Sequence, residues 1–178
     1  MNALILPGNS LRHREWGKDL AVAVTPLFGT VHMHEYRHWD TGEPEADTDY
    51  ELEQLQKLTA LGGYVIIAKS IGTVIAAIGI ERGVLTPTHC LFMGIPLNVV
   101  DQLKLDFADM MKNLPSTVIQ NTSDPYGSFA DVSTQLMSPT NAGSFSLIEN
   151  PGDTHDYLDF DQIKQLISVI DQNKAPIS

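Results

Sequence analysis

The chain has 178 residues, of which 43% are hydrophobic and 19% are charged, and 22 acidic residues against 11 basic ones give it a formal net charge of −11. This length and composition favour one globular domain over residues 1–178. The acidic charge argues against binding to nucleic acid or to an anionic membrane surface.

The cysteine content and the apolar runs exclude further classes of protein. The single cysteine, Cys90, rules out an intrachain disulfide framework and a cysteine-rich zinc module. The start of the chain lacks the basic segment of a signal peptide, and no stretch reaches the roughly 18 apolar residues of a membrane-spanning helix. We therefore expect a cytoplasmic protein.

Short apolar runs alternate with longer segments of helical periodicity, a pattern typical of βαβ units and a parallel sheet. The runs at 65–68 and 91–93 are continuously apolar, as expected where helices cover both faces of a sheet. Six runs are predicted as strands, at about 3–6, 30–36, 64–69, 89–95, 116–121 and 144–149.

Apolar stripes at helical spacing predict helices between the strands. In the second of these helices, Thr48 and Glu51 have the spacing of a capping box. The segment 71–82 is apolar almost all round, which predicts a buried central helix that ends near Gly83. Right-handed crossovers then predict an α/β three-layer sandwich with its functional face at the carboxyl ends of the strands. The four stripes are Trp16, Leu20, Ala23 and Val24; Leu52, Leu55, Leu58 and Leu61; Leu103, Phe107, Met110, Met111 and Leu114; and Phe160, Ile163, Leu166, Ile167 and Ile170.

Residues 68–72, Ala-Lys-Ser-Ile-Gly, lie where the most apolar strand passes into the most buried helix. They match the pattern G-x-S-x-G with alanine in the first position, and small residues there let the chain turn sharply. In such a turn Ser70 would project above the sheet, and the Ile71 N–H would point towards a developing oxyanion. Serine is also a favoured N-cap, so the motif by itself leaves a structural role for Ser70 open.

Two later loops offer an acid and a base. Asp124 follows the fifth predicted strand and His155 follows the sixth, so Ser70, Asp124 and His155 stand in that order along one edge of the sheet. A serine nucleophile needs a base to take its proton, and the base needs an acid to hold its tautomer. The three residues therefore predict a Ser-His-Asp triad, with Asp131 and Asp153 as alternative acids further from the strand end.

This arrangement resembles the α/β-hydrolase superfamily in three places: the strand-turn-helix at 68–72, the Asp-Pro pair at 124–125 and the segment Gly-Asp-Thr-His at 152–155. The resemblance covers nearly the whole chain and implies a six-stranded parallel sheet of order 2-1-3-4-5-6. The antiparallel strands that often precede this core are missing, and no insertion after the fourth strand is long enough for a lid. The chain is thus similar to the small, lidless members of the superfamily.

The resemblance also implies an oxyanion hole. In that superfamily the loop after the strand equivalent to the first one here supplies an N–H to the hole, and residues 6–10, Leu-Pro-Gly-Asn-Ser, fill that place. By position we assign this donor to Asn9, with Gly8 as the alternative, and the other donor to Ile71.

The predicted function is that of a serine hydrolase, resembling carboxylesterases, that cleaves an ester or related acyl bond of a small-molecule substrate without a cofactor. A thioesterase or acyl transferase with the same triad is an alternative, as is a non-catalytic binding module, because all share these residues. The sequence does not predict the oligomeric state. The predicted walls of the substrate pocket are Ser10, Tyr36, Trp39, Lys69, Pro96 and Tyr126.

Other candidate sites have weaker support. His32, His34 and His38 gather around the second predicted strand, but zinc usually takes three or more protein ligands, so we predict packing or surface histidines and no metal site. The loop after the first strand lacks the G-x-G-x-x-G and G-K-[ST] patterns of nucleotide sites. Cys90 opens an apolar strand and is predicted to be buried. For Lys69, contact with the substrate and extension to water both remain open.

The negative charge is concentrated in two blocks. Residues 41–60 hold six acidic residues and one basic residue, and residues 121–160 hold six acidic residues and no lysine or arginine. Each block begins at a loop after the carboxyl end of a predicted strand. We therefore hypothesise that negative charge borders the site and disfavours polyanionic substrates.

Overall fold

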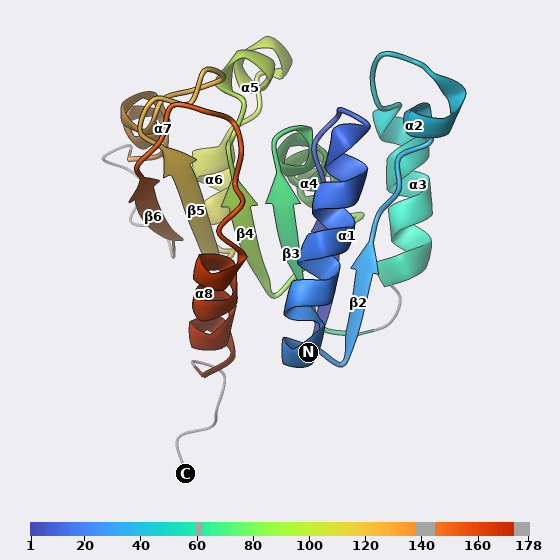
Figure 1. The fold of residues 1–178 in the computed structure, drawn as a ribbon. Helices are drawn as coiled ribbons and strands as arrows, with labels where there is room; N and C mark the ends of the chain where they lie inside the picture. The colour runs from blue at the N-terminus through green and yellow to red at the C-terminus, as the bar shows by residue number, and fades with distance from the viewer. Residues whose placement is uncertain (60–61, 138–144, 173–178) are drawn as a thin grey trace.

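The sheet of the computed structural model, which describes residues 1–59, 62–137 and 145–172, is parallel throughout. Its six strands follow the order β2-β1-β3-β4-β5-β6 (Figure 1), which confirms the predicted order and fold class. Two strands, β2 and β4, end earlier than the apolar runs suggest. The strands are β1 (Asn2–Leu6), β2 (Thr30–Met33), β3 (Tyr64–Lys69), β4 (His89–Met93), β5 (Ser116–Asn121) and β6 (Phe145–Asn150).

Helices cover both faces of the sheet and enclose two apolar cores (Figure 1). One core lies between the sheet and α1 (Arg12–Val24) and α8 (Phe160–Gln172). The other lies under the helices of the opposite face: α3 (Thr48–Thr59), α4 (Ile71–Glu81), α6 (Phe107–Met111) and α7 (Phe129–Leu136). None of the helices that the structure describes combines the length and the hydropathy needed to cross a membrane. The remaining short elements are η1 (Thr25–Leu27), α2 (His38–Thr41) and α5 (Leu97–Leu103).

The central helix α4 is buried as predicted, and Gly83 just beyond it has the positive φ, 68°, that ends such a helix. Cys90 of β4 is also fully buried, as predicted, and burial raises the pKa of its thiol. A thiol in this setting stays protonated and is a poor nucleophile.

The N-terminus of α3 differs from the predicted capping box. The side chain of Asp47 accepts the Tyr50 N–H at 3.2 Å, so Asp47 occupies the N-cap position predicted for Thr48. Glu51 does not reach back to the cap. Its carboxylate is buried and bonds instead to His34 Nε2 at 2.7 Å and to the Arg37 N–H at 2.9 Å. The prediction is wrong because Glu51 faces the interior, where these two groups hold it.

The helix predicted over residues 103–114 is in fact two short helices. Lys104 has a φ of 56° and ends α5, and the side chain of Asp106 caps α6 by accepting the Asp109 N–H at 2.8 Å. The break changes which residues are buried: Phe107 remains in the core, whereas Leu103 is 48% exposed. Only the α6 part of the predicted apolar stripe faces the core. The left-handed residue between the two helices rotates the α5 part out of line with it.

Two glycines allow close packing at the carboxyl edge of the sheet. Gly72, in the first turn of α4, lies so near β1 that a Cβ would overlap the Leu6 carbonyl group. Gly94 follows β4 with a φ of 62°, and a Cβ there would lie 2.8 Å from Cε1 of His155 and 2.6 Å from Cε2 of Tyr157. These small residues therefore let α4 begin against β1 and let His155 lie over the end of β4.

We expect Gly72→Ala to lower the free energy of unfolding by about 1–3 kcal/mol, because the added methyl group meets backbone atoms that cannot rotate away. Urea denaturation followed by circular dichroism would measure the change. Gly29→Ala is the matched control, since a Cβ there would stay 3.6 Å from its nearest neighbour. Equal stability of the two variants would contradict this account of the packing.

Candidate active site

Ser70 lies in a strained turn between β3 and α4. Its φ of 55° and ψ of −126° are values that residues with a side chain rarely adopt. The turn is held by the Ser70 N–H, which donates to the Met93 carbonyl at 3.0 Å, and by the Thr73 hydroxyl, which donates to the Ser70 carbonyl at 2.7 Å. The Ser70 side chain makes no capping hydrogen bond to α4. The alternative of a purely capping serine is therefore wrong, and no hydrogen bond of the hydroxyl to another described residue occurs.

Asp124 and His155 form a buried hydrogen-bonded pair. Nδ1 of His155 lies 2.8 Å from Oδ2 and 2.9 Å from Oδ1 of Asp124. The same carboxylate accepts the Tyr157 hydroxyl at 2.7 Å and the Tyr126 N–H at 2.9 Å. The Asp124 side chain is wholly buried, so these three donors replace the water that it loses. A hydrogen on Nδ1 of His155 leaves Nε2 as the basic nitrogen.

His155 and Ser70 meet at one pocket. Both line a cavity of about 490 Å³ at the carboxyl edge of the sheet. Nε2 of His155 is buried and has no hydrogen-bond partner in residues 1–59, 62–137 and 145–172. In enzymes without bound substrate, the bond between nucleophile and base is often long and closes only in the complex.

The two alternative acids lie outside this arrangement. Asp131 is exposed in the first turn of α7, where its carboxylate accepts the Ser128 hydroxyl at 2.6 Å. Asp153 is exposed in the loop after β6. Of the three candidate acids, the structure brings only Asp124 to His155.

Asn121, at the end of β5, braces the loop that carries His155. Its side-chain amide donates to the Thr154 carbonyl at 2.8 Å, and its backbone N–H donates to the Tyr157 hydroxyl at 3.1 Å. Burial raises the pKa of Tyr157, so this hydroxyl stays protonated and donates a hydrogen bond to Asp124. Sequence reasoning missed Asn121. The sequence feature that could have indicated Asn121 is its position as a polar residue at the end of an apolar strand, directly before the loop of Asp124.

The loop after β1 is held in place by side chains that donate hydrogen bonds to its backbone carbonyl groups. The Tyr36 hydroxyl donates to the Pro7 carbonyl at 2.9 Å. The Asn9 carbonyl accepts both Nε1 of Trp39 and Nε2 of His38, each at 2.7 Å. Three aromatic side chains that follow β2 therefore set the direction of the peptide groups in this loop.

The backbone N–H groups of the two residues predicted to form the oxyanion hole are unused in the described structure. Asn9 and Ile71 both line the pocket, and neither backbone N–H donates a hydrogen bond within the part of the chain that the structure describes. The N–H of Ile71 belongs to the first turn of α4, where amide groups lack helical acceptors.

The predicted pocket walls divide into two groups. Ser10, Pro96 and Tyr126 line the pocket, and the ring of Tyr126 lies 4.6 Å from that of His155, centre to centre. Tyr36 and Trp39 are buried behind the loop after β1 and do not line it, so their assignment as walls is wrong. The side chains of Tyr36 and Trp39 turn to the back of this loop because each donates a hydrogen bond to one of its backbone carbonyl groups.

Lys69 also lies outside the pocket. It is the last residue of β3, and strand alternation turns its side chain towards the α1 face. The side chain is 1% exposed, with Nζ 5.2 Å from the centre of the Trp16 ring and 3.9 Å from Oδ1 of Asp156. Burial lowers the pKa of Lys69 to about 8, even though Asp156 acts in the opposite direction. Both alternatives for Lys69 are therefore wrong: its side chain neither lines the pocket nor extends to water.

His13 is a pocket residue that sequence reasoning missed. It is buried in the first turn of α1, and its ring lies against Gly8, where a Cβ would overlap it. By distance and angle neither ring nitrogen bonds to a described residue, although the Gly8 backbone lies close enough to favour the protonated ring weakly. Burial, together with the positive charges of Lys69 and Arg12, lowers the pKa of His13 to about 4, so the ring is neutral at pH 7. The sequence feature that could have indicated a buried His13 is its position one helical turn before Trp16, on the same face of the helix.

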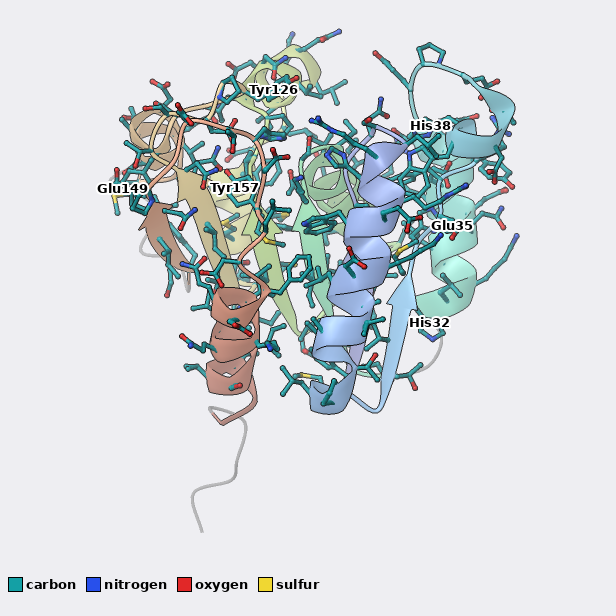
Figure 2. The ribbon with its side chains drawn as sticks, in the orientation of Figure 1. His32, Glu35, His38, Tyr126, Glu149 and Tyr157 are labelled. Atoms are coloured by element: carbon teal, nitrogen blue, oxygen red, sulfur yellow. The ribbon has the colours of Figure 1, made fainter. Side chains whose placement is uncertain are left out.

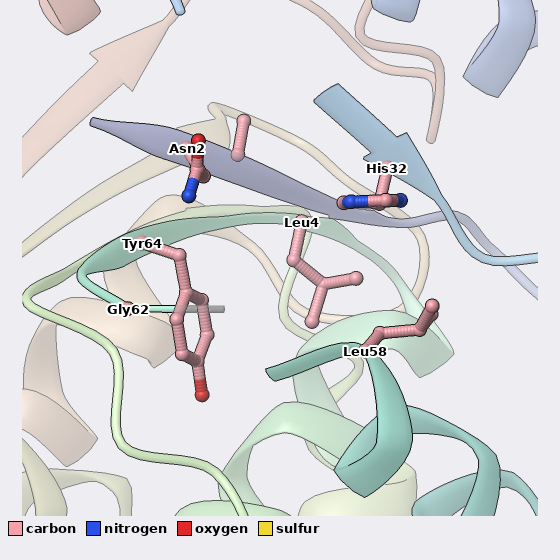
Figure 3. A pocket seen from close by; sticks show the side chains of 7 residues that line it. Asn2, Leu4, His32, Leu58, Gly62 and Tyr64 are labelled. Atoms are coloured by element: carbon pink, nitrogen blue, oxygen red, sulfur yellow. The ribbon is translucent and has the colours of Figure 1, made fainter. Parts of the chain in front are cut away.

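The three histidines near β2 do not converge. His34 pairs with Glu51 and His38 bonds to the Asn9 carbonyl, whereas Figure 2 shows His32 beside β2, well below His38. His32 borders a separate cavity with Leu4 (Figure 3). That cavity measures about 20 Å³, which is room for little more than one water molecule. No group of three metal-binding side chains occurs within residues 1–59, 62–137 and 145–172.

Two arginines partly offset the acidic block at residues 41–60. Arg37 lies 3.1 Å from Asp47 and 3.6 Å from Glu43, and Arg82 pairs with Asp49. Glu45 is the one acidic residue that the structure places in the lining of the pocket. The hypothesis of a negatively charged border therefore applies to Glu45 alone among the lining residues.

Known proteins match this chain in fold and not in sequence. No family model matches it, and no curated protein matches its sequence. A Xanthomonas campestris pv. campestris protein assigned to the α/β-hydrolase superfamily superposes with a TM-score of 0.67 at 17% identity, over 97% of this chain and 98% of its own. A serine hydrolase without a lid from Xanthomonas campestris gives 0.66 at 17% identity, over 99% of this chain and 83% of its own.

A third solved structure, acyl-protein thioesterase 2 from Zea mays, superposes with a TM-score of 0.67 at 10% identity, over 97% of this chain and 93% of its own. Together with the strand order, these matches confirm that the chain has the α/β-hydrolase fold.

We expect Lys69→Met to raise the free energy of unfolding at pH 7 by up to about 2 kcal/mol, because it removes a charge that burial disfavours. The pKa of Lys69 is lowered from 10.5 to about 8, so the unfolded chain binds more protons between these two values. Wild-type stability should therefore increase as the pH rises through this window, and the penalty is fully present below it.

Urea denaturation at neutral pH and near pH 10 would test this expectation. The exposed Lys57 of α3 supplies the control variant Lys57→Met, which should keep the wild-type increase in stability, whereas Lys69→Met should lose it. An undiminished increase in Lys69→Met would show that the buried amine does not cause the pH dependence.

Proposed function

We propose that this protein, with its α/β-hydrolase fold, is a serine hydrolase that cleaves an ester or related acyl bond of a small substrate. The observation that carries the proposal is the strained turn at Ser70, which shares a pocket with the buried pair of His155 and Asp124. Backbone strain of this kind clusters at active sites, and a base with a free nitrogen is what a serine nucleophile needs.

The reaction would proceed through an acyl-enzyme. Ser70 Oγ attacks the acyl carbon while Nε2 of His155 takes its proton, and Asp124 holds the resulting imidazolium in place. The tetrahedral intermediate then collapses, and His155 passes the proton to the leaving alcohol. Water, deprotonated by His155, next attacks the acyl carbon to form a second tetrahedral intermediate. Its collapse breaks the bond to Ser70, whose Oγ takes the proton back from His155, and releases the acid.

The oxyanion would be held by the N–H groups of Ile71 and Asn9, with Gly8 as the alternative to Asn9. The dipole of α4 adds to the donor at Ile71. His38 and Trp39 fix the Asn9 carbonyl, and with it the peptide group between Asn9 and Ser10. This rigidity, directly after the peptide group that carries the Asn9 N–H, supports the assignment of Asn9.

The pocket suits a small acyl substrate. One wall is apolar, built by Val74 of α4 with Val99 and Leu103 of α5. Between β4 and β5 the chain forms just α5 and α6, so the described structure places no separate lid over this opening. An open pocket of about 490 Å³ supports short acyl groups over long lipid chains.

A thioesterase is the second candidate, and the fold likeness to the acyl-protein thioesterase of Zea mays favours it. An acyl transferase would use the same residues with a different acceptor. Rates on matched butyryl esters and butyryl thioesters, with and without an added alcohol acceptor, would distinguish the three reactions.

Labelling with a fluorophosphonate probe tests the proposal. We expect the wild-type protein to be labelled, Ser70→Ala to be unlabelled, and His155→Ala to be labelled at least about a hundredfold more slowly, since the serine then lacks its base. Ser168→Ala, on the far helix α8, is the control and should react like wild type. Absence of labelling in wild type would leave a non-catalytic binding module, and labelling of Ser70→Ala would exclude Ser70 as the nucleophile.

We expect Trp39→Phe to lower kcat on a butyryl ester about tenfold with little change in KM, because the lost indole N–H loosens a donor that acts mainly in the transition state. Steady-state kinetics would measure both constants, and thermal denaturation would show whether the variant is folded. Tyr50→Phe, which changes another aromatic residue after β2, should behave like wild type. A change in KM alone would mean that Trp39 affects substrate binding and not the oxyanion donor.

A further inference from the structure

Arg12 is a cation at the candidate catalytic pocket that pairs with none of the carboxylates the structure describes. It is the first residue of α1, it is exposed, and it lines the same pocket as Ser70 and His155. No ion pair or hydrogen bond of its side chain occurs within the described parts of the chain. The guanidinium group is therefore available to a ligand in the pocket.

The other arginines of the chain are all paired. Arg14 lies 2.7 Å from Asp40, Arg37 lies 3.1 Å from Asp47, and Arg82 pairs with Asp49. In a chain of net charge −11, carboxylates are plentiful. A shortage of carboxylates therefore does not explain why Arg12, alone among the arginines, has no partner in the described structure.

The surroundings of Arg12 leave its charge uncompensated. His13 beside it is neutral at pH 7, because burial lowers its pKa to about 4, and the positive charges of Lys69 and Arg12 add to this effect. Glu45 lines the same pocket but lies beyond ion-pair distance from Arg12. The N-terminal end of the α1 dipole adds positive potential at this position.

We propose that Arg12 binds an anionic group of the substrate, so that the protein acts on esters or thioesters that also carry a carboxylate. This inference rests on the proposed hydrolase function. A guanidinium group offers a carboxylate two parallel hydrogen bonds, and the hydroxyl of the neighbouring Ser10 is a further donor at the pocket. A single arginine in an acidic protein matches a singly charged carboxylate better than a doubly charged phosphate.

Two sets of substrates, each built on one ester framework with different charges, test the proposal. The first set consists of p-nitrophenyl esters of adipic acid, of its isosteric monoamide and of 6-(trimethylammonio)hexanoic acid, which place the charge on the acyl side. The second set consists of butyryl esters of 4-hydroxybenzoic acid and of 4-hydroxybenzamide, which place it on the leaving group. We expect the carboxylate member of at least one set to have a kcat/KM about tenfold above its neutral partner at low salt, and the ratio to fall as salt is added.

Variants assign the preference to Arg12. Arg12→Gln should reduce the ratio of kcat/KM between carboxylate and neutral substrate to about one, and Arg12→Lys should restore part of it. Glu45→Gln should increase the ratio, because it removes the competing negative charge of the pocket. Lys57→Gln, which removes the same charge from the exposed face of α3, is the matched control and should leave the ratio unchanged.

The outcomes separate the two proposals. Hydrolysis of the neutral esters without any preference for a carboxylate in either set would overturn the role of Arg12 and leave the hydrolase intact. A preference that survives Arg12→Gln would likewise overturn it. Failure to hydrolyse any ester or thioester, together with absence of fluorophosphonate labelling, would overturn the hydrolase function itself.

Discussion

The candidate site depends on the buried carboxylate of Asp124. A wholly buried carboxylate is tolerated only when donors replace its lost water, and Asp124 obtains these from His155, Tyr157 and the Tyr126 N–H. Because two of the donors belong to the loop after β6, satisfying the carboxylate also places the histidine. The same loop is joined to α1, since Nε1 of Trp16 donates to the Tyr157 carbonyl at 2.8 Å.

The two ends of the site are built by the same principle. At the basic end, the amide of Asn121 holds the loop of His155 by its backbone carbonyl groups, and at the other end Trp39 and His38 hold the Asn9 carbonyl. In both cases buried polar side chains behind the pocket orient the groups that face it. Two cations near the site have different surroundings: Lys69 is enclosed next to Trp16, whereas Arg12 lines the pocket and pairs with no described carboxylate.

Local sequence signals failed where a distant segment competed for the same side chain. Thr48 and Glu51 have capping-box spacing, yet Glu51 is held by His34 and by the backbone after β2. Tyr36 and Trp39 stand at a strand end like true wall residues, but the loop after β1 captures their polar groups. Spacing along the chain reports neither contact, because each joins segments that meet only when the sheet has assembled.

The sequence by itself determined the α/β fold, the sheet order through its family resemblance, and the order of Ser70, Asp124 and His155 along one edge. It could do so because apolar runs and helical stripes are local patterns, and parallel strands bring their carboxyl ends together. Only the tertiary structure decided which acid reaches His155, which strand-end residues face the pocket, and which arginine remains unpaired. Those outcomes depend on distances between side chains far apart in sequence, and on the burial that makes the Asp124 carboxylate take donors from His155, Tyr157 and the Tyr126 N–H.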